Sequence, residues 1–138
     1  MSYDLHPSAV ADSPLGQPES PIRAVILGQH PTRVRVLADL FNEDQRMKVV
    51  AGCSDILDCG VILNAQIPKV DLLICGGYFE LQDVQDMLAE VENDGLRLLK
   101  VPDGLMMEGG GPPAVKAWVY EQIEKNLFTL TRPAPPTA

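Results

Sequence analysis

The residue types best suited to chemistry near the start of the chain stand between an apolar run and a polar helix start. Residues 23–27 are mostly apolar, and Gly28, Gln29 and His30 follow them directly. In open α/β proteins such a junction lies at the carboxyl edge of the sheet, where ligands bind. Together with Gly76, which follows a later apolar run, Gly28 and His30 define a candidate edge for a small ligand or a nucleotide.

Catalytic and cofactor chemistry is weakly supported by these residues. A dinucleotide-binding turn requires Gly-x-Gly-x-x-Gly, and this pattern fails after its first glycine at Gly28. The glycine run 109–111 lacks the lysine and hydroxyl residue of a phosphate-binding P-loop. His30 has no obvious nucleophile, so a structural or surface role is favoured, and Asp71 is interpreted as a strand cap. We therefore predict no enzyme activity, no catalytic residue and no bound cofactor.

The cysteines Cys53, Cys59 and Cys75 lie in or beside apolar segments and lack Cys-x-x-Cys spacing. A structural zinc site would need a fourth ligand, and neither His6 nor His30 stands at a recognisable finger spacing. Free cysteine is among the most buried residue types. We predict reduced thiols that pack as small apolar groups, with a redox switch as the alternative, and no metal site.

The charge balance limits the classes of partner. Lys and Arg total 11 and Asp and Glu total 19, for a formal net charge of −8. A nucleic acid requires a basic face, so direct nucleic-acid binding is disfavoured. No run approaches the roughly 18–20 apolar residues of a membrane helix, and the polar N-terminus lacks the basic and apolar regions of a signal peptide. These features predict a cytoplasmic protein without a membrane segment.

The elements that must position these residues alternate between strands and helices. Apolar runs predict strands at 22–27, 47–53, 70–75 and 96–101, with 105–107 as an optional short fifth. Helical spacing predicts helices over 32–42, from the cap at Ser54 or Asp55 to Pro68, over 81–91, and from Pro112 to Leu127. The alternation predicts a flavodoxin-like, doubly wound α/β fold with a parallel sheet of four to five strands between two helical layers.

Both ends of the chain are rich in proline and lack a periodic apolar pattern. Residues 1–21 contain Pro7, Pro14, Pro18 and Pro21, and 131–138 form a second proline-rich stretch. Such segments cannot bury enough surface to offset the entropy of ordering. We predict a disordered arm at 1–21, one folded domain at 22–130 and a disordered tail at 131–138.

The order and lengths of these elements resemble the receiver domains of bacterial response regulators, especially those of the NarL class. The turn 29–31 (Gln-His-Pro), the helix after it, and residues 42–50 resemble the opening strand, helix and strand of these receivers. The segment 104–108, followed by Pro113 and a helix, resembles their closing strand, lysine position and last helix.

The resemblance implies which residues would carry phosphoryl chemistry. In a receiver, two acids after the first strand and an acceptor aspartate after the third hold Mg²⁺ for phosphoryl transfer. The acid pair matches Gly28 and Gln29, the acceptor matches Gly76, or Cys75 if the register moves by one, and the lysine matches Glu108. None of these substitutes can perform the function of the residue that it replaces, which indicates a degenerate receiver.

One further departure concerns the helix that receivers place before their closing strand. Too few residues separate Val101 from Leu105 to hold it, so we predict that this helix is deleted. The resemblance then implies a non-phosphorylatable pseudo-receiver, a regulatory protein–protein interaction module of two-component signalling. Its expected partner is a signalling or transcriptional regulator, and a homodimer through Trp118 is left open. The alternative is a small-ligand or nucleotide-binding domain that uses Gly28, His30 and Gly76.

Overall fold

The computed structural model describes residues 21–105 and 110–133. In these ranges four parallel strands form one sheet in the order β2-β1-β3-β4. The elements are β1 (Ile22–Leu27), α2 (Pro31–Asn42), β2 (Met47–Cys53), α3 (Ile56–Ala65), β3 (Leu72–Cys75), α4 (Leu81–Leu88), β4 (Arg97–Lys100) and α5 (Pro112–Lys125). The predicted flavodoxin-like α/β fold with a parallel sheet is confirmed.

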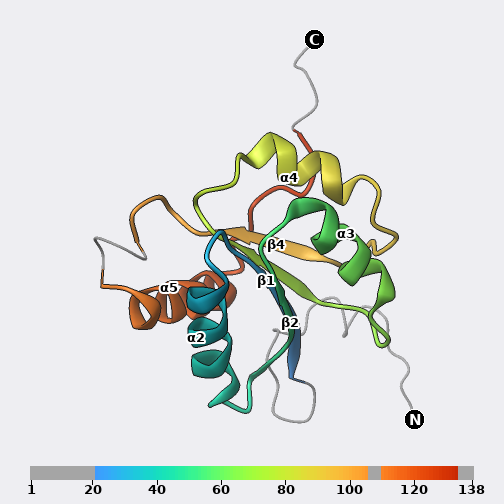
Figure 1. Ribbon diagram of the computed structural model, residues 1–138. Coiled ribbons are helices and arrows are strands. Elements are labelled where there is room, and N and C mark those ends of the chain that lie inside the picture. The colour runs from blue at the N-terminus through green and yellow to red at the C-terminus, as the bar shows by residue number, and fades with distance from the viewer. Residues whose placement is uncertain (1–20, 106–109, 134–138) are drawn as a thin grey trace, which may run out of the picture.

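Helices cover both faces of the sheet. Figure 1 shows α2 and α5 side by side on one face and α3 with α4 on the other. Successive strand residues point to opposite faces. In β1, Ala24 and Ile26 therefore pack beneath α2 and α5, while Val25 and Leu27 pack beneath α3 and α4. The sheet separates two apolar cores, and each core belongs to one helical layer.

Helices α2 and α3 begin for reasons that are visible in the sequence. Pro31 occupies the first turn of α2, where its missing N–H has no helical partner to lose. Asp55 caps α3, because its Oδ1 accepts hydrogen bonds from the backbone N–H groups of Leu57 (2.8 Å) and Asp58 (3.1 Å). The cap predicted at Ser54 or Asp55 is therefore made by Asp55.

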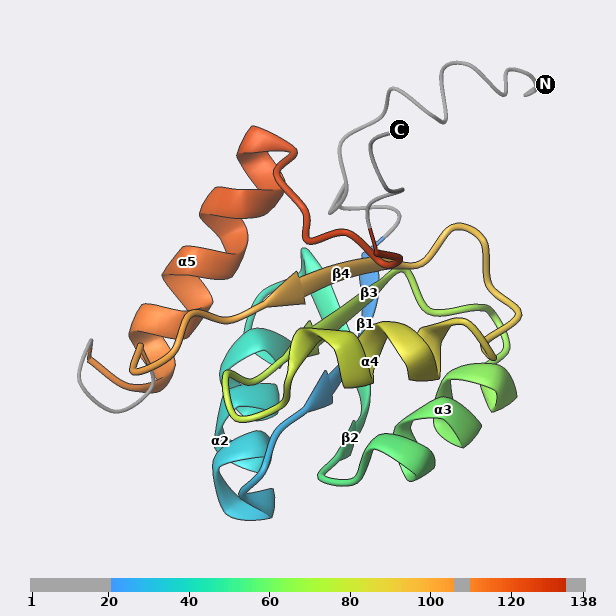
Figure 2. The ribbon, with the colours of Figure 1, turned by 90° about the horizontal axis from the view of Figure 1, so that it is seen from above.

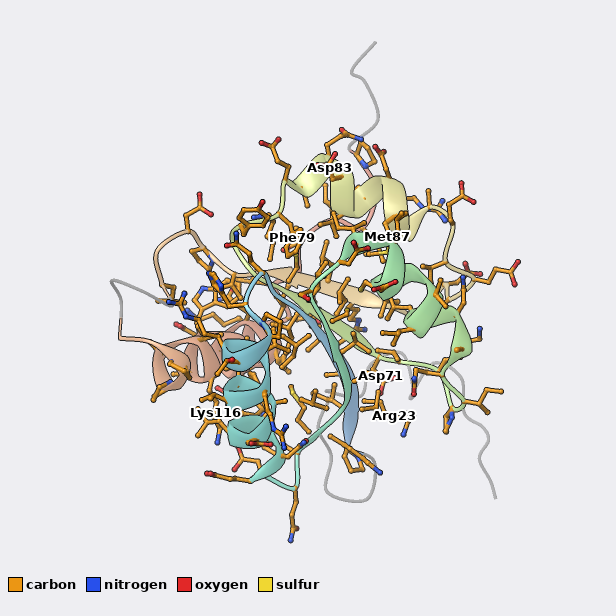
Figure 3. The ribbon with its side chains drawn as sticks, viewed as in Figure 1. Arg23, Asp71, Phe79, Asp83, Met87 and Lys116 are labelled. Carbon is orange, nitrogen blue, oxygen red and sulfur yellow. The ribbon has the colours of Figure 1, made fainter. Side chains whose placement is uncertain are left out.

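The third strand begins later than predicted, at Leu72. Asp71 instead uses its side chain, and its Oδ2 accepts a hydrogen bond from the Arg23 backbone N–H at 2.9 Å. The two residues lie side by side at the start of β1 and β3 (Figure 3). This geometry confirms the interpretation of Asp71 as a strand cap.

The last helix ends before Leu127, contrary to the prediction. Asn126 adopts a left-handed conformation (φ 56°), and the Leu127 backbone N–H donates to the Gln122 carbonyl at 2.9 Å. This pattern is a common helix end that turns the chain away from the helical axis. Leu127 is 55% exposed, whereas the half-buried Trp118 packs against the core beneath α2 and α5.

The residues after α5 return to the free edge of β4 (Figure 2). The Thr129 backbone N–H donates to the Leu98 carbonyl at 2.8 Å, and the Lys100 N–H donates to Thr129 Oγ1 at 3.0 Å. From α4, the buried Gln85 amide donates to the Leu130 carbonyl at 3.0 Å. This antiparallel segment covers the edge at which a fifth parallel strand would pair.

The fifth strand at 105–107 is not formed at its first position, because Leu105 lies in a turn. Met106 and Met107 lie outside the described residues, as do Glu108, the predicted arm over residues 1–20 and the tail over 134–138. The described parts of 101–111 contain turns and no helix, as the predicted loss of the helix before the closing strand requires. Across the described ranges, no helix is long and apolar enough to cross a bilayer.

Candidate functional site

The carboxyl ends of β1, β3 and β4 surround a hollow of about 530 Å³. Gly28, Gln29 and His30 follow β1 there, and Gly76 and Gly77 follow β3. Clefts of this size hold small ligands in many proteins. The structure thus brings together Gly28, His30 and Gly76, the edge predicted from the sequence.

Much of the lining of the hollow is apolar. Val34 and Leu37 enter from α2, Val101 and Pro102 follow β4, and Val115 comes from α5. An apolar wall with a few convergent polar groups is typical of small-molecule sites. The side of α2 that carries Val34 and Leu37 therefore contributes both to the core and to the lining of the hollow.

The polar side chains among the described lining residues are Gln29, His30, Arg33, Tyr78 and Asp103. His30 is exposed at the N-cap of α2, where its side chain makes no capping hydrogen bond. Arg33 adds a positive charge and Asp103 a negative one, so the described lining has no strong excess of either sign.

Steric packing explains the glycine at position 28. A Cβ there would lie 2.7 Å from Val34 Cγ2, and a Cβ at Gly52 would lie 2.6 Å from Val34 Cγ1. Val34 therefore fits between the ends of β1 and β2 only because Gly28 and Gly52 have no side chains. Gly28 has no left-handed backbone conformation, so close packing and not backbone conformation accounts for a glycine at this position.

Gly76 is less constrained than Gly28. Its backbone N–H donates to the Leu27 carbonyl at 2.7 Å, which holds the ends of β1 and β3 together. A Cβ at position 76 would lie 3.5 Å from the Leu27 carbonyl oxygen and 3.6 Å from Gly28 Cα, which are ordinary contact distances. A small side chain would fit at position 76, so packing does not account for its absence.

The loop after β3 is fixed against the loop after β4. Lys100 Nζ donates to the Gly77 carbonyl at 3.2 Å, and a Cβ at Gly77 would lie 2.6 Å from Asp103 Oδ1. Sequence reasoning missed Arg33, Lys100 and Asp103 as residues of this edge. The available signal was their position, because Lys100 ends β4, Asp103 follows in the next loop, and Arg33 lies in the first turn of the helix after β1.

Cys75 belongs to the core and not to the hollow. Cys75 is buried in the core beneath α3 and α4. The next residue, Gly76, follows β3 and lines the hollow. Burial raises the pKa of the Cys75 thiol to about 12. The thiol is therefore protonated near neutral pH and is a poor nucleophile.

Cys53 and Cys59 are also free thiols, and Cys59 is buried whereas Cys53 is partly exposed. A hydrogen bond between the two lowers the pKa of Cys53 and, together with burial, raises the pKa of Cys59. The prediction that all three cysteines pack as small apolar groups holds for Cys59 and Cys75, while Cys53 lies at the boundary of the core.

The arrangement of the elements is similar to that of the signal receiver domain of NarL from Mycobacterium tuberculosis. The two structures align with a TM-score of 0.52 over 75% of this chain and 97% of that chain, at 12% sequence identity. This chain has a receiver fold. No protein-family profile and no curated protein sequence matches it. The likeness shows the shared fold, and the residues at the sheet edge must be considered separately for function.

The receiver fold places the residues matched to the acidic cluster at one edge, but their chemistry does not suit Mg²⁺. This ion prefers several oxygen ligands, including carboxylates. Gly28 and Gly76 offer no side-chain oxygen, Gln29 offers one amide oxygen, and Asp103 is the one carboxylate on the described lining. Across the described ranges, no three His, Cys, Asp or Glu side chains are grouped to hold a metal ion. The residues present do not fit the magnesium site of a receiver.

Proposed function

We propose that this chain is a receiver-like regulatory module that does not accept a phosphoryl group and acts by binding a protein partner. One observation carries the proposal. The fold brings Gly28, Gln29 and Gly76 to a common edge, where the receiver mechanism requires two acids and an acceptor aspartate. Because position 76 has room for a side chain, the missing acceptor is a chemical difference and not a packing requirement.

A module without phosphoryl chemistry needs another source of signal. A protein shifts between conformations only when something binds one of them more tightly. For this chain we propose that the abundance of the module or the binding of a partner sets the output. The expected partner is a signalling or transcriptional regulator inside the cell.

The phosphoryl part of the proposal is tested by incubating the full chain with acetyl phosphate and Mg²⁺ and measuring its intact mass. We expect no change, while an active receiver treated in parallel gains a phosphoryl group. An aspartyl phosphate on this chain would overturn the proposal. The variant Asp103→Asn then shows whether the one described carboxylate of the hollow had taken over as acceptor.

The partner part is tested by tagging the chain in its native cell, cross-linking and identifying captured proteins by mass spectrometry. Reproducible capture of a signalling or transcriptional regulator supports the proposal. Recovery of the chain alone with a co-purifying small molecule favours the ligand-binding alternative described next.

The hollow itself favours a second candidate function, the binding of a small ligand or nucleotide near Gly28, His30 and Gly76. Thermal unfolding with nucleotides, flavins and other small metabolites tests this candidate. A ligand at about 100 times its Kd should stabilise the native chain by roughly 2.7 kcal/mol. The variant Gly76→Leu should fill part of the hollow and abolish the shift, whereas the distant control Leu57→Ser should retain it.

A further inference from the structure

The surface over α3 and α4 is strongly acidic. Asp55 at the N-cap of α3, Asp58 on α3, Asp83 and Asp86 on α4, and Glu90 after α4 are all exposed. Lys69 is the only lysine or arginine between residues 54 and 95. A concentration of one charge sign raises the local potential and attracts a partner of the opposite sign.

An apolar stripe runs along the outer side of α3. Leu57 is 79% exposed and Val61 is 69% exposed, and Ala65 is exposed four residues further on. Residues four apart lie on the same side of a helix. We refer to Leu57, Val61 and Ala65 as the α3 stripe. Adjoining apolar side chains that remain in water commonly mark an interaction surface.

The acids of α4 belong to a helix that packs directly against α3. A Cβ at Gly60 of α3 would lie 3.3 Å from Met87 Cγ of α4. Asn64 also joins them, since its Nδ2 donates to the Glu90 carbonyl at 3.4 Å and its Oδ1 accepts from the Glu92 N–H at 2.8 Å. In Figure 3, Met87 lies between α4 and α3, and Asp83 lies on the outer side of α4.

Among the described residues, no lysine, arginine or histidine forms an ion pair with these acids. The ion pairs between described residues lie within α5 or join α5 to the turn between α2 and β2. On α4, Asp86 instead accepts a hydrogen bond from the neutral Gln82 amide at 2.9 Å. Residues 1–20, 106–109 and 134–138 contain no lysine or arginine, and His6 is their one histidine.

We propose that the α3 stripe and its flanking acids form a docking surface for a basic amphipathic helix of a partner protein. Apolar residues of that helix would cover Leu57 and Val61, and its lysines or arginines would face Asp58, Asp86 and Glu90. This mode of recognition places one apolar helix face on an apolar surface and uses charge for specificity. The inference rests on the proposed interaction role.

Charge excludes two other occupants. The N-terminal residues 1–20 carry Asp4, Asp12 and Glu19 and no lysine or arginine, so they would add negative charge to an acidic surface. A two-fold dimer through this surface would place the same acids of both copies against one another. Both arrangements oppose like charges, which a basic partner avoids.

The test uses the full chain, labelled with ¹⁵N, and a synthetic peptide of leucine and lysine with leucine at helical spacing. We expect saturable NMR shifts that are confined to residues of α3 and α4. A scrambled peptide of the same composition and a leucine–glutamate peptide should each bind at least tenfold more weakly. The affinity should fall as salt is added, because the acids are exposed.

Paired variants separate the docking surface from nonspecific attraction. Leu57→Ser with Val61→Ser, and separately Asp86→Lys with Glu90→Lys, should each weaken the lysine peptide tenfold or more. The matched controls are Val36→Ser and Asp39→Lys on α2, where Val36 is 49% exposed and Asp39 is exposed. Their affinity should equal that of the wild type. Dispersed NMR spectra of every variant verify folding.

Three results would overturn the docking surface: no saturable binding of the lysine peptide, shifts centred on α2 or on the hollow, or equal affinity in the variants and controls. If the free chain dimerised with rising concentration and Leu57→Ser abolished this dimerisation, the α3 stripe would instead be the contact with a second copy of the chain. The acetyl phosphate measurement is independent of all of these, so a failed docking surface leaves the proposed receiver-like role separately testable.

Discussion

The two helical layers on either side of the sheet treat their charges in different ways. In the α2/α5 layer, Lys116 Nζ lies 3.0 Å from Asp44 Oδ2 and also donates to the Leu40 carbonyl at 3.1 Å. The guanidinium of Arg46 lies 4.5 Å from the centre of the Tyr120 ring and 3.6 Å from the Glu124 carboxylate. These contacts pair charged groups within the layer and connect α5 to α2 and to the turn that follows it.

The α3/α4 layer leaves its acids and two large apolar side chains in water. Leu57 and Val61 are exposed, and Asp58, Asp86 and Glu90 lack ion-pair partners among the described residues. The comparison teaches that two helical layers can each bury an apolar core against the sheet and still present different surfaces to the solvent. One layer is adapted to the stability of the fold, and we propose that the other is adapted to binding.

The largest expected change in the free energy of unfolding comes from removing a buried apolar side chain, and removing an exposed one provides the comparison. Phe41 is fully buried in the α2/α5 layer. Its ring packs edge-on against the Tyr120 ring, with 5.7 Å between the ring centroids. Phe41→Ala should lower the free energy of unfolding by about 3–5 kcal/mol through lost burial and a cavity. Leu57→Ala should change it by less than about 0.5 kcal/mol. Urea unfolding measures both, and a large loss in Leu57→Ala would show that the stripe is already covered.

The next largest change in stability tests how α2 packs against the end of β1. Gly28→Ala should destabilise the chain by about 1–3 kcal/mol, because the new Cβ would collide with Val34. Val34→Ala should relieve much of that collision, so the loss in the double variant should be smaller than the sum of the single losses. Strict additivity in a double-mutant cycle would contradict the packing explanation of Gly28.

A smaller effect concerns the ion pair that distinguishes the α2/α5 layer. A hydrogen bond from Lys116 holds the pKa of Asp44 below its usual value. A lowered folded pKa stabilises the native state above the unfolded pKa of about 3.9, and the contribution is lost as the pH falls through the folded pKa. Lys116→Met should cost about 1 kcal/mol at pH 7. The difference from wild type should shrink below about pH 4, and a constant difference would contradict the ion-pair assignment.

The smallest effect is expected for a charge reversal in the α3/α4 layer, and the same kind of reversal in the α2/α5 layer serves as its comparison. Asp86→Lys should leave stability within about 0.5 kcal/mol of wild type, because it removes repulsion from neighbouring acids and places a cation near the end of α4. Asp44→Lys should be clearly destabilising, because it sets a second cation beside Lys116. Thermal unfolding at low and high salt measures both changes. Equal losses in the two variants would remove the electrostatic distinction between the layers.

Local patterns were sufficient for most elements of the fold. The strands predicted at 22–27 and 47–53 have the observed bounds, and Asp55, one of the two predicted caps, caps its helix. These features depend on apolar runs and on side chains that bond to nearby backbone, so neighbouring residues suffice to specify them. The errors at Leu105 and Leu127 arose where apolar residues continued a pattern beyond the point at which the chain turns.

The candidate site was predicted in part. Gly28, His30 and Gly76 follow strands directly, and the carboxyl ends of parallel strands share one edge, so their proximity followed from fold class. Arg33, Lys100 and Asp103 were missed, because their roles depend on how separate loops meet. The reason for glycine at position 28 was also hidden, since Val34 approaches it only after α2 packs on the sheet.

The sequence by itself determined the alternation of strands and helices, the net negative charge, and the substitution of every residue matched to the receiver's phosphoryl site. These properties are local or additive, and they do not depend on distant contacts. The tertiary structure decided that Thr129 pairs with β4, that three strand ends enclose a hollow, and that α3 and α4 share an acidic surface. Each of these depends on segments far apart in sequence that come together only when apolar faces are buried on both sides of the sheet.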